Sequence, residues 1–370
     1  MKLILTTVVA LSLAAQAINQ VNPASASQFD AETIARNLET PWAMAFAPDG
    51  RMFITERPGR IRVVERDVLN PSPWAVIPVN ESAQRGLESG LMGLAIDPQF
   101  ARNRRVYVCY THSGAGSTSN RIGVLTEEKG KGTNLTVLLD GMPAGAYHNG
   151  CRLKFGPDGK LYATAGDGAS DRPGGRAAQS LESLGGKVLR LNPDGSLPND
   201  NPFPKSYVWS YGHRNQQGLA FQPQTGRLFA TEHGTGAGGN NELNVIERGK
   251  NYAWPTAVGA EPHTGFTAPI LSRPDAPAGA TFVTGNRYPE LRGRLLIATL
   301  SAQRLLGVVL GDGGAPSVVR TDVLIQGTYG RLRDVIQGPD AFLYIATSNR
   351  DGRGQPGPED DRVLRLTRRR

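Results

Sequence analysis

Apolar residues recur along this chain in short alternating runs, and one phrase made of two such runs is repeated. Each copy contains an apolar strand, a turn with Pro and often Asp-Gly or Thr-Gly, and a second apolar strand. Alternating apolar positions suit a half-buried strand, and the turn glycine supplies the positive φ that a tight hairpin needs. Five clear copies and a weaker sixth occupy residues 44–56, 93–111, 153–167, 219–234, 335–348 and 282–300.

The spacing of the hairpins predicts a β-propeller. Most copies start about 40 to 65 residues apart, which is enough for a four-stranded antiparallel sheet and a long loop. An open stack of hairpins would use the same strands, but large irregular loops between regular strands favour a closed ring with the loops on one face. The 45 glycines and 26 prolines fit short strands joined by turns. We therefore expect an all-β, six-bladed propeller that forms one domain over residues 30–366.

The N-terminus has the pattern of an export signal. Met1-Lys2 is followed by the apolar run LILTTVVALSLAAQA and by Ala24-Ser25-Ala26, all before the first acidic residue, Asp30. This predicts a signal peptide over residues 1–26, with Ala17 as a second candidate cleavage site. An uncleaved anchor is the alternative, but the run is short for a span of about 20 residues. We expect a soluble protein without a membrane span, exported to the periplasm or secreted.

Charge and cysteine content say little about which function the protein has, but the charge pattern argues against one class of partner. The net charge of +8 comes from scattered arginines, without the long basic run or aromatic-basic interleaving of nucleic-acid binders, so no nucleic-acid partner is expected. The two cysteines, Cys109 and Cys151, could form a disulfide in an oxidising compartment or remain two buried thiols.

Three polar clusters lie at the ends of the repeated hairpins. His148 precedes one hairpin, in HNGCRL, and is either a structural residue or a general base. Arg214 and Asn215 precede another and could simply tie down a loop. Arg331 and Arg333 lie two positions apart, on one side of a strand. Two adjacent guanidinium groups favour a carboxylate or phosphate ligand between them, with a solvated face as the alternative.

A fourth cluster is the glycine-rich segment that begins at Glu232, in EHGTGAGGNNELNVIERGKNYAWP. It offers backbone carbonyls and the carboxylate of Glu242, which are the oxygen ligands that Ca²⁺ prefers. The chain lacks the cysteine and histidine clusters of a zinc site. Because a propeller gathers its loops around the axis, we expect all four clusters to meet there.

In combination these motifs resemble those of the soluble quinoprotein glucose and aldose dehydrogenases, the glucose/sorbosone dehydrogenase family. The motifs occur in the family's order from about Leu38 to Leu366, and they include LETPWAMAFAPDGRMFITER, GLESGLMGLAIDPQF, HNGCRLKFGPDG, YGHRNQQGL, GGNNELNVIERGKNYAWP and GRLRDV. The resemblance implies a propeller that holds pyrroloquinoline quinone (PQQ) and Ca²⁺ at the loop-rich end of its axis. The implied reaction oxidises the anomeric hydroxyl of an aldose to a lactone.

The resemblance also implies roles for single residues. It makes His148 the general base, places Arg214 and Asn215 over the quinone oxygens, and assigns the cofactor carboxylates to Arg331 and Arg333. The other implied positions are Glu88 and His233 facing the cofactor, the carbonyls of Gly234 and Thr235 on the cofactor-bound Ca²⁺, and Glu242 with the Tyr252 carbonyl at a second, structural calcium site.

The chain departs from the glucose-oxidising members at one cofactor-facing position. Leu300 and Ser301 stand where those members place a lysine against PQQ, so one charge contact is missing. The chain is also shorter than those enzymes and resembles the compact aldose dehydrogenase branch. We therefore expect an aldose substrate, without assuming that glucose is the preferred one, and an electron acceptor that is a quinone or a small redox protein.

Two other functions fit a propeller of this kind. A calcium-dependent lactonase would hold its metal with side-chain carboxylates and would not need Arg331 and Arg333. A non-catalytic binding propeller would not need His148. The chemistry of the residues favours the dehydrogenase, because a neutral imidazole can take the hydroxyl proton as hydride leaves the same carbon.

Overall fold

The computed structural model describes residues 28–369 except 80–86, 115–116, 170–175, 236–239, 260–262 and 312. The predicted signal peptide lies outside the described residues. Within them, no helix is both long enough and apolar enough to span a bilayer.

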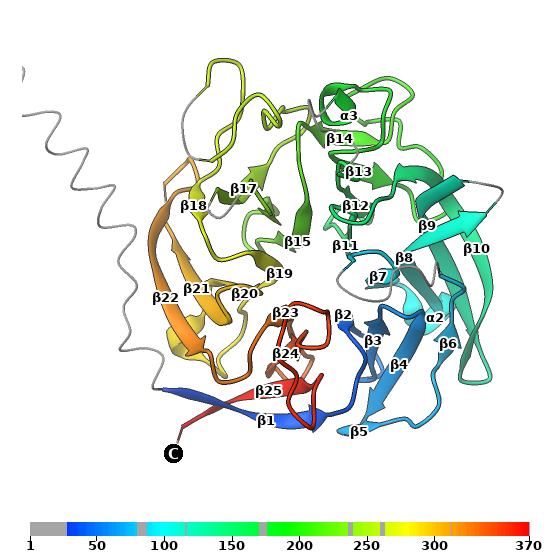
Figure 1. The fold of residues 1–370 in the computed structure, drawn as a ribbon, viewed down its shortest axis with the longest axis vertical. Helices are drawn as coiled ribbons and strands as arrows, with labels where there is room; N and C mark the ends of the chain where they lie inside the picture. Colours follow the sequence, from blue (N-terminus) through cyan, green and yellow to red (C-terminus); the bar gives the residue numbers. More distant parts are fainter. Residues whose placement is uncertain are drawn as a thin grey trace, which may run out of the picture.

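The described strands form six antiparallel sheets arranged around a central axis (Figure 1). The first three sheets contain β2 (Pro41–Phe46), β3 (Met52–Glu56), β4 (Arg60–Glu65) and β5 (Val68–Leu69), with β6 (Ala75–Val76) also on β4; β7 (Leu91–Ile96), β8 (Arg105–Gly114), β9 (Ser117–Glu128) and β10 (Lys131–Pro143); and β11 (Gly150–Phe155), β12 (Leu161–Ala165), β13 (Lys187–Leu191) and β14 (Val208–Tyr211). The helical elements are short: α2 (Phe100–Asn103), α3 (Arg176–Gln179) and η3 (Pro289–Leu291).

The other three sheets complete the ring. They contain β15 (Gln216–Phe221), β16 (Leu228–Glu232), β17 (Asn241–Ile246) and β18 (Leu271–Arg273); β19 (Pro277–Phe282), β20 (Leu295–Thr299), β21 (Arg304–Leu310) and β22 (Val318–Gln326); and β23 (Leu332–Gln337), β24 (Leu343–Thr347), β25 (Val363–Arg368) and β1 (Phe29–Ala35).

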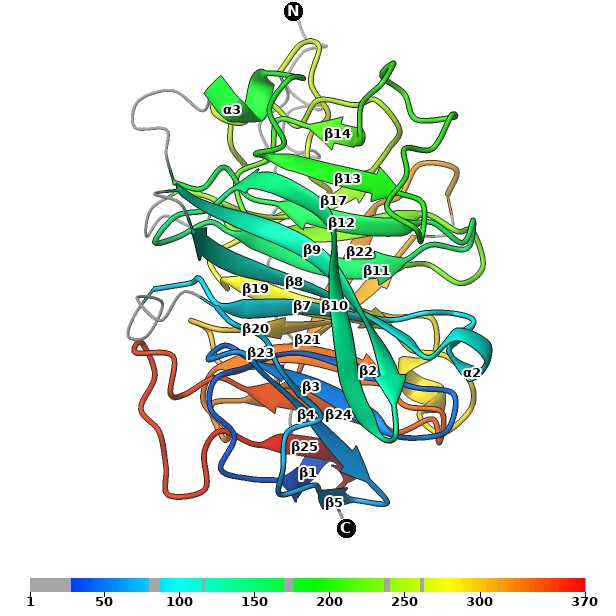
Figure 2. The same ribbon diagram turned by 90° about the vertical axis from the view of Figure 1, so that its right-hand side faces the viewer.

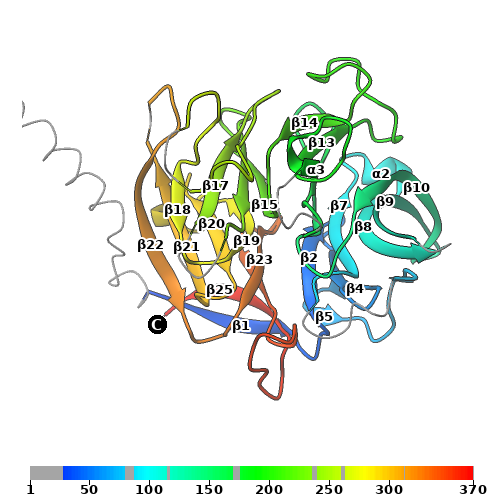
Figure 3. The same ribbon diagram turned by 45° about the horizontal axis from the view of Figure 1, so that its top comes forward.

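The prediction of a six-bladed β-propeller is confirmed. The five clear hairpins supply the two innermost strands of a blade, whereas the weaker copy at 282–300 contains β20 and only the last residue of β19. The innermost strands β2, β7, β11, β15, β19 and β23 contact one another in a ring around the axis (Figure 1 and Figure 3). The turns follow the predicted chemistry, since Gly50 and Gly159, in the Pro-Asp-Gly turns of two repeated hairpins, have φ values of +87° and +72°.

The ring is closed by pairing of the two ends of the described chain. Strand β1 pairs antiparallel with β25, from Phe29 opposite Arg368 to Ala35 opposite Val363. The sixth blade therefore contains the first strand and the last three strands of the fold. In the side view, the loop between β24 and β25 and the helix α3 lie toward the same face of the ring (Figure 2).

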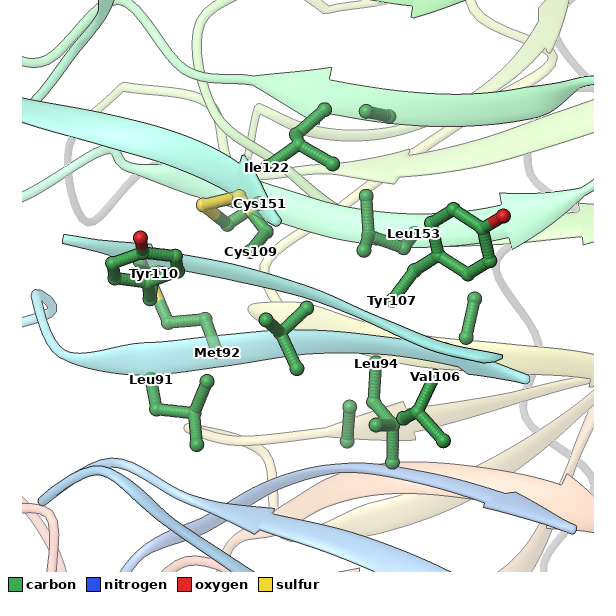
Figure 4. Packing of buried hydrophobic residues seen from close by; sticks show 14 of the residues in the cluster. Leu91, Met92, Leu94, Val106, Tyr107, Cys109, Tyr110, Ile122, Cys151 and Leu153 are labelled. Carbon is green, nitrogen blue, oxygen red and sulfur yellow. A yellow bond between two sulfur atoms is a disulfide. The ribbon is translucent and has the colours of Figure 1, made fainter. Parts of the chain in front are cut away.

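The blades pack through buried apolar faces, and one interface carries a disulfide. Cys109 on β8 and Cys151 on β11 are bonded, with their Cα atoms 5.5 Å apart, so the bond joins the second and third blades. Figure 4 shows it among Met92, Tyr110 and Ile122, which belong to a buried cluster that spans the first three blades. The alternative of two free thiols is thereby excluded.

Candidate active site

His148 lies directly before the inner strand β11, in a backbone conformation fixed from three sides. Its φ is +60°. Its N–H donates to Glu88 Oε2 at 2.9 Å, and its carbonyl accepts from Gly168 N at 3.0 Å. A Cβ on Gly166 would lie 1.9 Å from the His148 carbonyl oxygen, so only glycine allows β12 to approach this closely. The loop thus holds the imidazole at the end of the third blade.

The imidazole is oriented by Asp167, a residue that the sequence analysis did not single out. His148 Nδ1 lies 2.8 Å from Asp167 Oδ1, and the Asp167 carboxylate is almost fully buried. The same carboxylate accepts from Ala169 N and Trp254 Nε1, each at 2.9 Å. A carboxylate at Nδ1 favours the tautomer that carries its proton there, which leaves the Nε2 lone pair available to accept a proton. The side chain of His148 is 17% exposed, so a ligand can reach it.

Arg214 and Asn215 lie at the start of β15, beside the His148 loop. The Arg214 carbonyl accepts from Asp167 N at 2.9 Å, and its guanidinium donates to the carbonyls of His233 and Gly234 at 3.1 and 2.6 Å. Asn215 Oδ1 accepts from Gly150 N at 3.2 Å. Both residues therefore hold loops in place, which was the simpler interpretation of this pair. The loops that they hold lie next to the His148 imidazole.

Glu88 and His233 form a coupled pair in the same region. Glu88 accepts from His148 N, from Asn215 Nδ2 at 3.4 Å and from Arg353 at 3.0 Å. Burial raises the pKa of Glu88, but His233, the His148 N–H and Arg353 outweigh burial and keep the pKa below its ordinary value. Burial lowers the pKa of His233, whose Nε2 lies 2.8 Å from the Pro277 carbonyl. Near neutral pH the pair thus consists of a carboxylate and a neutral imidazole.

Arg331 and Arg333 lie together, as predicted, and a protein carboxylate lies between them. Asp351 Oδ2 accepts from Arg331 Nε and Nη2 at 3.0 and 2.9 Å and is 3.8 Å from Arg333 Nη2. The arginine pair was predicted to bind the anionic group of a ligand. In the structure, Asp351 of the protein itself supplies part of that negative charge. Arg333 also donates to Gln217 Oε1 at 3.0 Å, but its buried Nε has no hydrogen-bond partner among the described residues. Burial lowers the pKa of Arg333 to about 10.

The carbonyls predicted to bind the cofactor-linked calcium lie at this end of the fourth blade. The Gly234 carbonyl is engaged by Arg214, and Thr235 follows it, partly exposed. No three His, Cys, Asp or Glu side chains cluster as a metal site in the part of the chain that the structure describes. A cation here would rely on backbone oxygens, as the sequence analysis supposed.

The second predicted metal position is a small pocket lined by Glu242 and Tyr252. Glu242 lies opposite Glu232 in the β16–β17 pairing, and Asn244 Nδ2 donates to both carboxylates, at 3.0 and 3.2 Å. Burial, and next the charge of Glu232, raises the pKa of Glu242 to about 8. The predicted site contained Glu242 and the Tyr252 carbonyl but not Glu232. The structure adds the Glu232 carboxylate to this site.

Leu300 and Ser301 form the turn after β20. Leu300 is buried and donates from its backbone to the Ala276 carbonyl at 3.0 Å, whereas Ser301 is exposed, with Oγ 3.5 Å from the Pro274 carbonyl. The turn therefore packs on residues 274–277. The last of these, Pro277, has its carbonyl within hydrogen-bonding distance of His233 Nε2. Its direct contact with a cofactor stays a prediction.

Comparisons with known proteins agree with this geometry. The model of a family described as glucose/sorbosone dehydrogenase matches residues 38–364. This match and the six blades define the class of protein, a β-propeller oxidoreductase. The chain belongs to the glucose/sorbosone dehydrogenase family, which confirms the resemblance seen in its motifs.

Individual relatives cover nearly the whole chain. Aldose sugar dehydrogenase YliI of Escherichia coli is 31% identical over 355 residues, which are 89% of this chain and 92% of the relative. The PQQ-bound aldose sugar dehydrogenase of Streptomyces coelicolor has a TM-score of 0.80 and 33% identity, over 93% of this chain and 99% of the other. A Thermus thermophilus structure provisionally described as an oxidoreductase (glucose dehydrogenase) has a TM-score of 0.82 and 43% identity, over 92% and 100% of the two chains.

Proposed function

We propose that this protein is a PQQ- and calcium-dependent aldose dehydrogenase that oxidises the anomeric hydroxyl of its substrate to a lactone. The observation that carries the proposal is the His148–Asp167 pair beside buried arginines at the loop-rich end of the ring. The Streptomyces neighbour is named as a PQQ-bound aldose sugar dehydrogenase, which supports the choice of cofactor and substrate class. The N-terminal pattern supports export to the periplasm or secretion.

The residues present fit a cofactor that carries three carboxylates. Arg333 is buried with an Nε that lacks a hydrogen-bond partner in the described chain, and such a donor is costly unless a ligand satisfies it. Asp351 neutralises one of the two arginines, which leaves positive charge for the cofactor. Arg331, Arg333, Arg214 and Asn215 would hold PQQ, with Glu88 and His233 beside it. When bound, PQQ supplies the acceptor for the hydride that leaves the anomeric carbon.

The chain's own residues account for the proton. His148 Nε2 takes the proton of the anomeric hydroxyl, and Asp167 stabilises the imidazolium that results through Nδ1–H. Glu88 and Gly166 keep the His148 backbone in place, so the imidazole does not need to reorganise during the reaction. The guanidinium of Arg214, held by the carbonyls of His233 and Gly234, would supply fixed positive charge to the bound quinone.

Calcium is proposed at two places. The carbonyls of Gly234 and Thr235 would hold the cofactor-linked ion, and Arg214 must then release the Gly234 carbonyl. Glu242 and the Tyr252 carbonyl would hold a structural ion, with Glu232 adding a second carboxylate close by. Ca²⁺ favours this all-oxygen set of ligands.

The alternative of a propeller lactonase or hydrolase is less well supported. In the described chain the carboxylates do not form a metal cluster, and the buried arginines would have no substrate charge to bind. A non-catalytic binding propeller would not require the imidazole–carboxylate pair. The natural electron acceptor is proposed to be a quinone or a small redox protein.

Reconstitution tests the proposal. PQQ is titrated into chelator-treated protein with and without Ca²⁺, and aldose-dependent dye reduction is then measured. We expect little PQQ binding until Ca²⁺ is restored, because carbonyl ligands alone cannot neutralise the cofactor, and we expect activity only with both. Equal PQQ affinity with and without Ca²⁺ would contradict the calcium assignment, and PQQ binding without any aldose oxidation would contradict the reaction.

A further inference from the structure

A polar cavity lies on the propeller axis, lined by all six innermost strands. Its volume is about 300 Å³. The lining residues come from the later parts of these strands, away from the ends that carry His148 and Arg214, and include Met44, Leu94, Arg152, Lys154, Leu219, Thr281 and Asp334. None of the predicted site residues lines it. The cavity is therefore separate from the candidate active site.

Trp42 lies between the two regions. The Arg333 guanidinium, from the candidate site, lies over the Trp42 ring at 5.9 Å, and the Arg152 guanidinium, from the cavity, lies over the same ring at 4.2 Å. Gln217 also joins them, since its side-chain oxygen accepts from Arg333 and its carbonyl accepts from Arg152 at 2.8 Å. The two regions are neighbours along the axis, divided by an indole and a glutamine.

The charges of the cavity do not balance. Asp334 accepts from Arg152 Nη1 at 3.1 Å and from Met44 N at 2.9 Å. Arg152 is 6% exposed, and its Nη2 has no hydrogen-bond partner among the described residues. Lys154 also lines the cavity and is exposed to it, without a hydrogen bond or ion pair to the described protein. Two cations and one carboxylate leave one positive charge.

Both free donors can bind an anion. An unsatisfied guanidinium N–H in a buried site costs free energy that a hydrogen-bonded anion recovers. Desolvation by the surrounding strands lowers the pKa of Lys154, opposed by the charge of Asp334, so an anion beside Nζ would stabilise its charged form. The apolar residues around the donors lower the local dielectric and strengthen such a contact.

We propose that the axial cavity is a binding site for a small oxyanion, a phosphate or a carboxylate, held by Lys154 Nζ and Arg152 Nη2. The cavity has room for such an ion together with several waters, since one water occupies about 30 Å³. The inference does not depend on the dehydrogenase activity, because none of its residues takes part in the proposed reaction.

Calorimetric titration of inorganic phosphate, and separately of acetate, tests the proposal on the PQQ- and calcium-loaded protein, in which the arginines of the candidate site are occupied. We expect saturable binding of at least one ion. Lys154→Met should weaken that binding about ten- to hundredfold, the value of one charge-assisted hydrogen bond. Lys154→Arg should retain it, and Lys129→Met, which removes an exposed charge from the β9–β10 turn, should leave it unchanged. Binding that is insensitive to Lys154→Met would overturn the proposal.

Crystals of the apoprotein soaked in selenate give a test that needs no cofactor. An anomalous selenium peak within hydrogen-bonding distance of Lys154 Nζ and Arg152 Nη2 is the expected result. Peaks confined to Arg331 and Arg333, or to the outer surface, would mean an adventitious ion only and would refute the axial site. A failure of PQQ binding leaves this readout intact, so the two proposals can fail separately.

Discussion

Replacing Asp167 with Asn tests the proposed base most directly, because it removes one charge and keeps the shape of the side chain. The carboxylate uses Oδ1 for His148 and Ala169 and Oδ2 for Trp254. An Asn side chain has only one oxygen, so one side must face an N–H donor. If the NH₂ group turns to His148, the imidazole must carry its proton on Nε2 and can no longer act as a base. If it turns to Trp254, the imidazolium loses its counter-charge.

The expected loss follows from either orientation. Removing the corresponding charge in catalytic triads costs about 10⁴-fold, and losing a general base costs about 10²- to 10⁴-fold. We therefore expect Asp167→Asn to lower kcat by about 10²- to 10⁴-fold, which is about 2.7 to 5.5 kcal/mol in the barrier. PQQ affinity should change little, because Asp167 is not among the residues proposed to contact the cofactor.

The assay is aldose-dependent dye reduction by protein reconstituted with PQQ and Ca²⁺, with kcat, KM and PQQ affinity measured separately. Asp158→Asn is the matched control, since Asp158 also accepts from an aromatic side chain, Tyr162, in the same blade. In a His148→Asn background, adding Asp167→Asn should cost nothing more, because the carboxylate acts through the imidazole. A kcat within a fewfold of wild type, or the same loss in both backgrounds, would refute this role.

Three further outcomes are expected. Arg333→Ala should weaken PQQ binding about ten- to hundredfold in a fluorescence titration, and more than Arg331→Ala does, because Arg331 already donates to Asp351 whereas Arg333 Nε has no partner in the described chain; equal affinities would contradict this. Replacing both Cys109 and Cys151 with Ala should cost about 4 kcal/mol in denaturant unfolding, from a loop of 42 residues, whereas an unchanged midpoint would contradict it. Without Ca²⁺, wild-type stability should fall by up to about 1.4 kcal/mol per pH unit from about pH 5 to about pH 8, because the folded protein keeps on Glu242 a proton that the unfolded chain has already lost, and it should level off above pH 8; Glu242→Gln should lack this slope and any stabilisation by Ca²⁺.

The inner half of every blade could be predicted from the sequence because its signals are local. Alternation over five or six residues and a Pro-Asp-Gly turn specify a hairpin without reference to the rest of the chain. The outer strands carry weaker signals: β9 (Ser117–Glu128) and β10 (Lys131–Pro143) are long, half exposed and interrupted by register shifts. The pairing of Cys109 with Cys151 stayed open for a related reason, since only the ring places β8 against β11.

Individual residues of the candidate site could be predicted from the sequence, but the hydrogen bonds and ion pairs that connect them could not. His148, Arg214, Arg331 and Glu242 stand in distinctive motifs, so the family resemblance locates them. Their carboxylate partners do not stand in such motifs, because an Asp at the end of a strand has no local feature that reveals its partner on a neighbouring loop. Asp167 and Asp351 are of this kind, and their presence changes the chemistry of the residues they contact.

The closure of the ring by β1 and β25 has a consequence for the order of folding. Five sheets are built from consecutive stretches of chain, and each can be completed from nearby residues. The sixth joins Phe29 to Arg368, so its last pairing closes a loop of almost the entire domain and bears the largest entropic cost. Completion of this blade is therefore expected to be the last step of assembly, and a chain that lacks either end strand keeps five complete sheets but loses the β1–β25 pairing that joins its two ends.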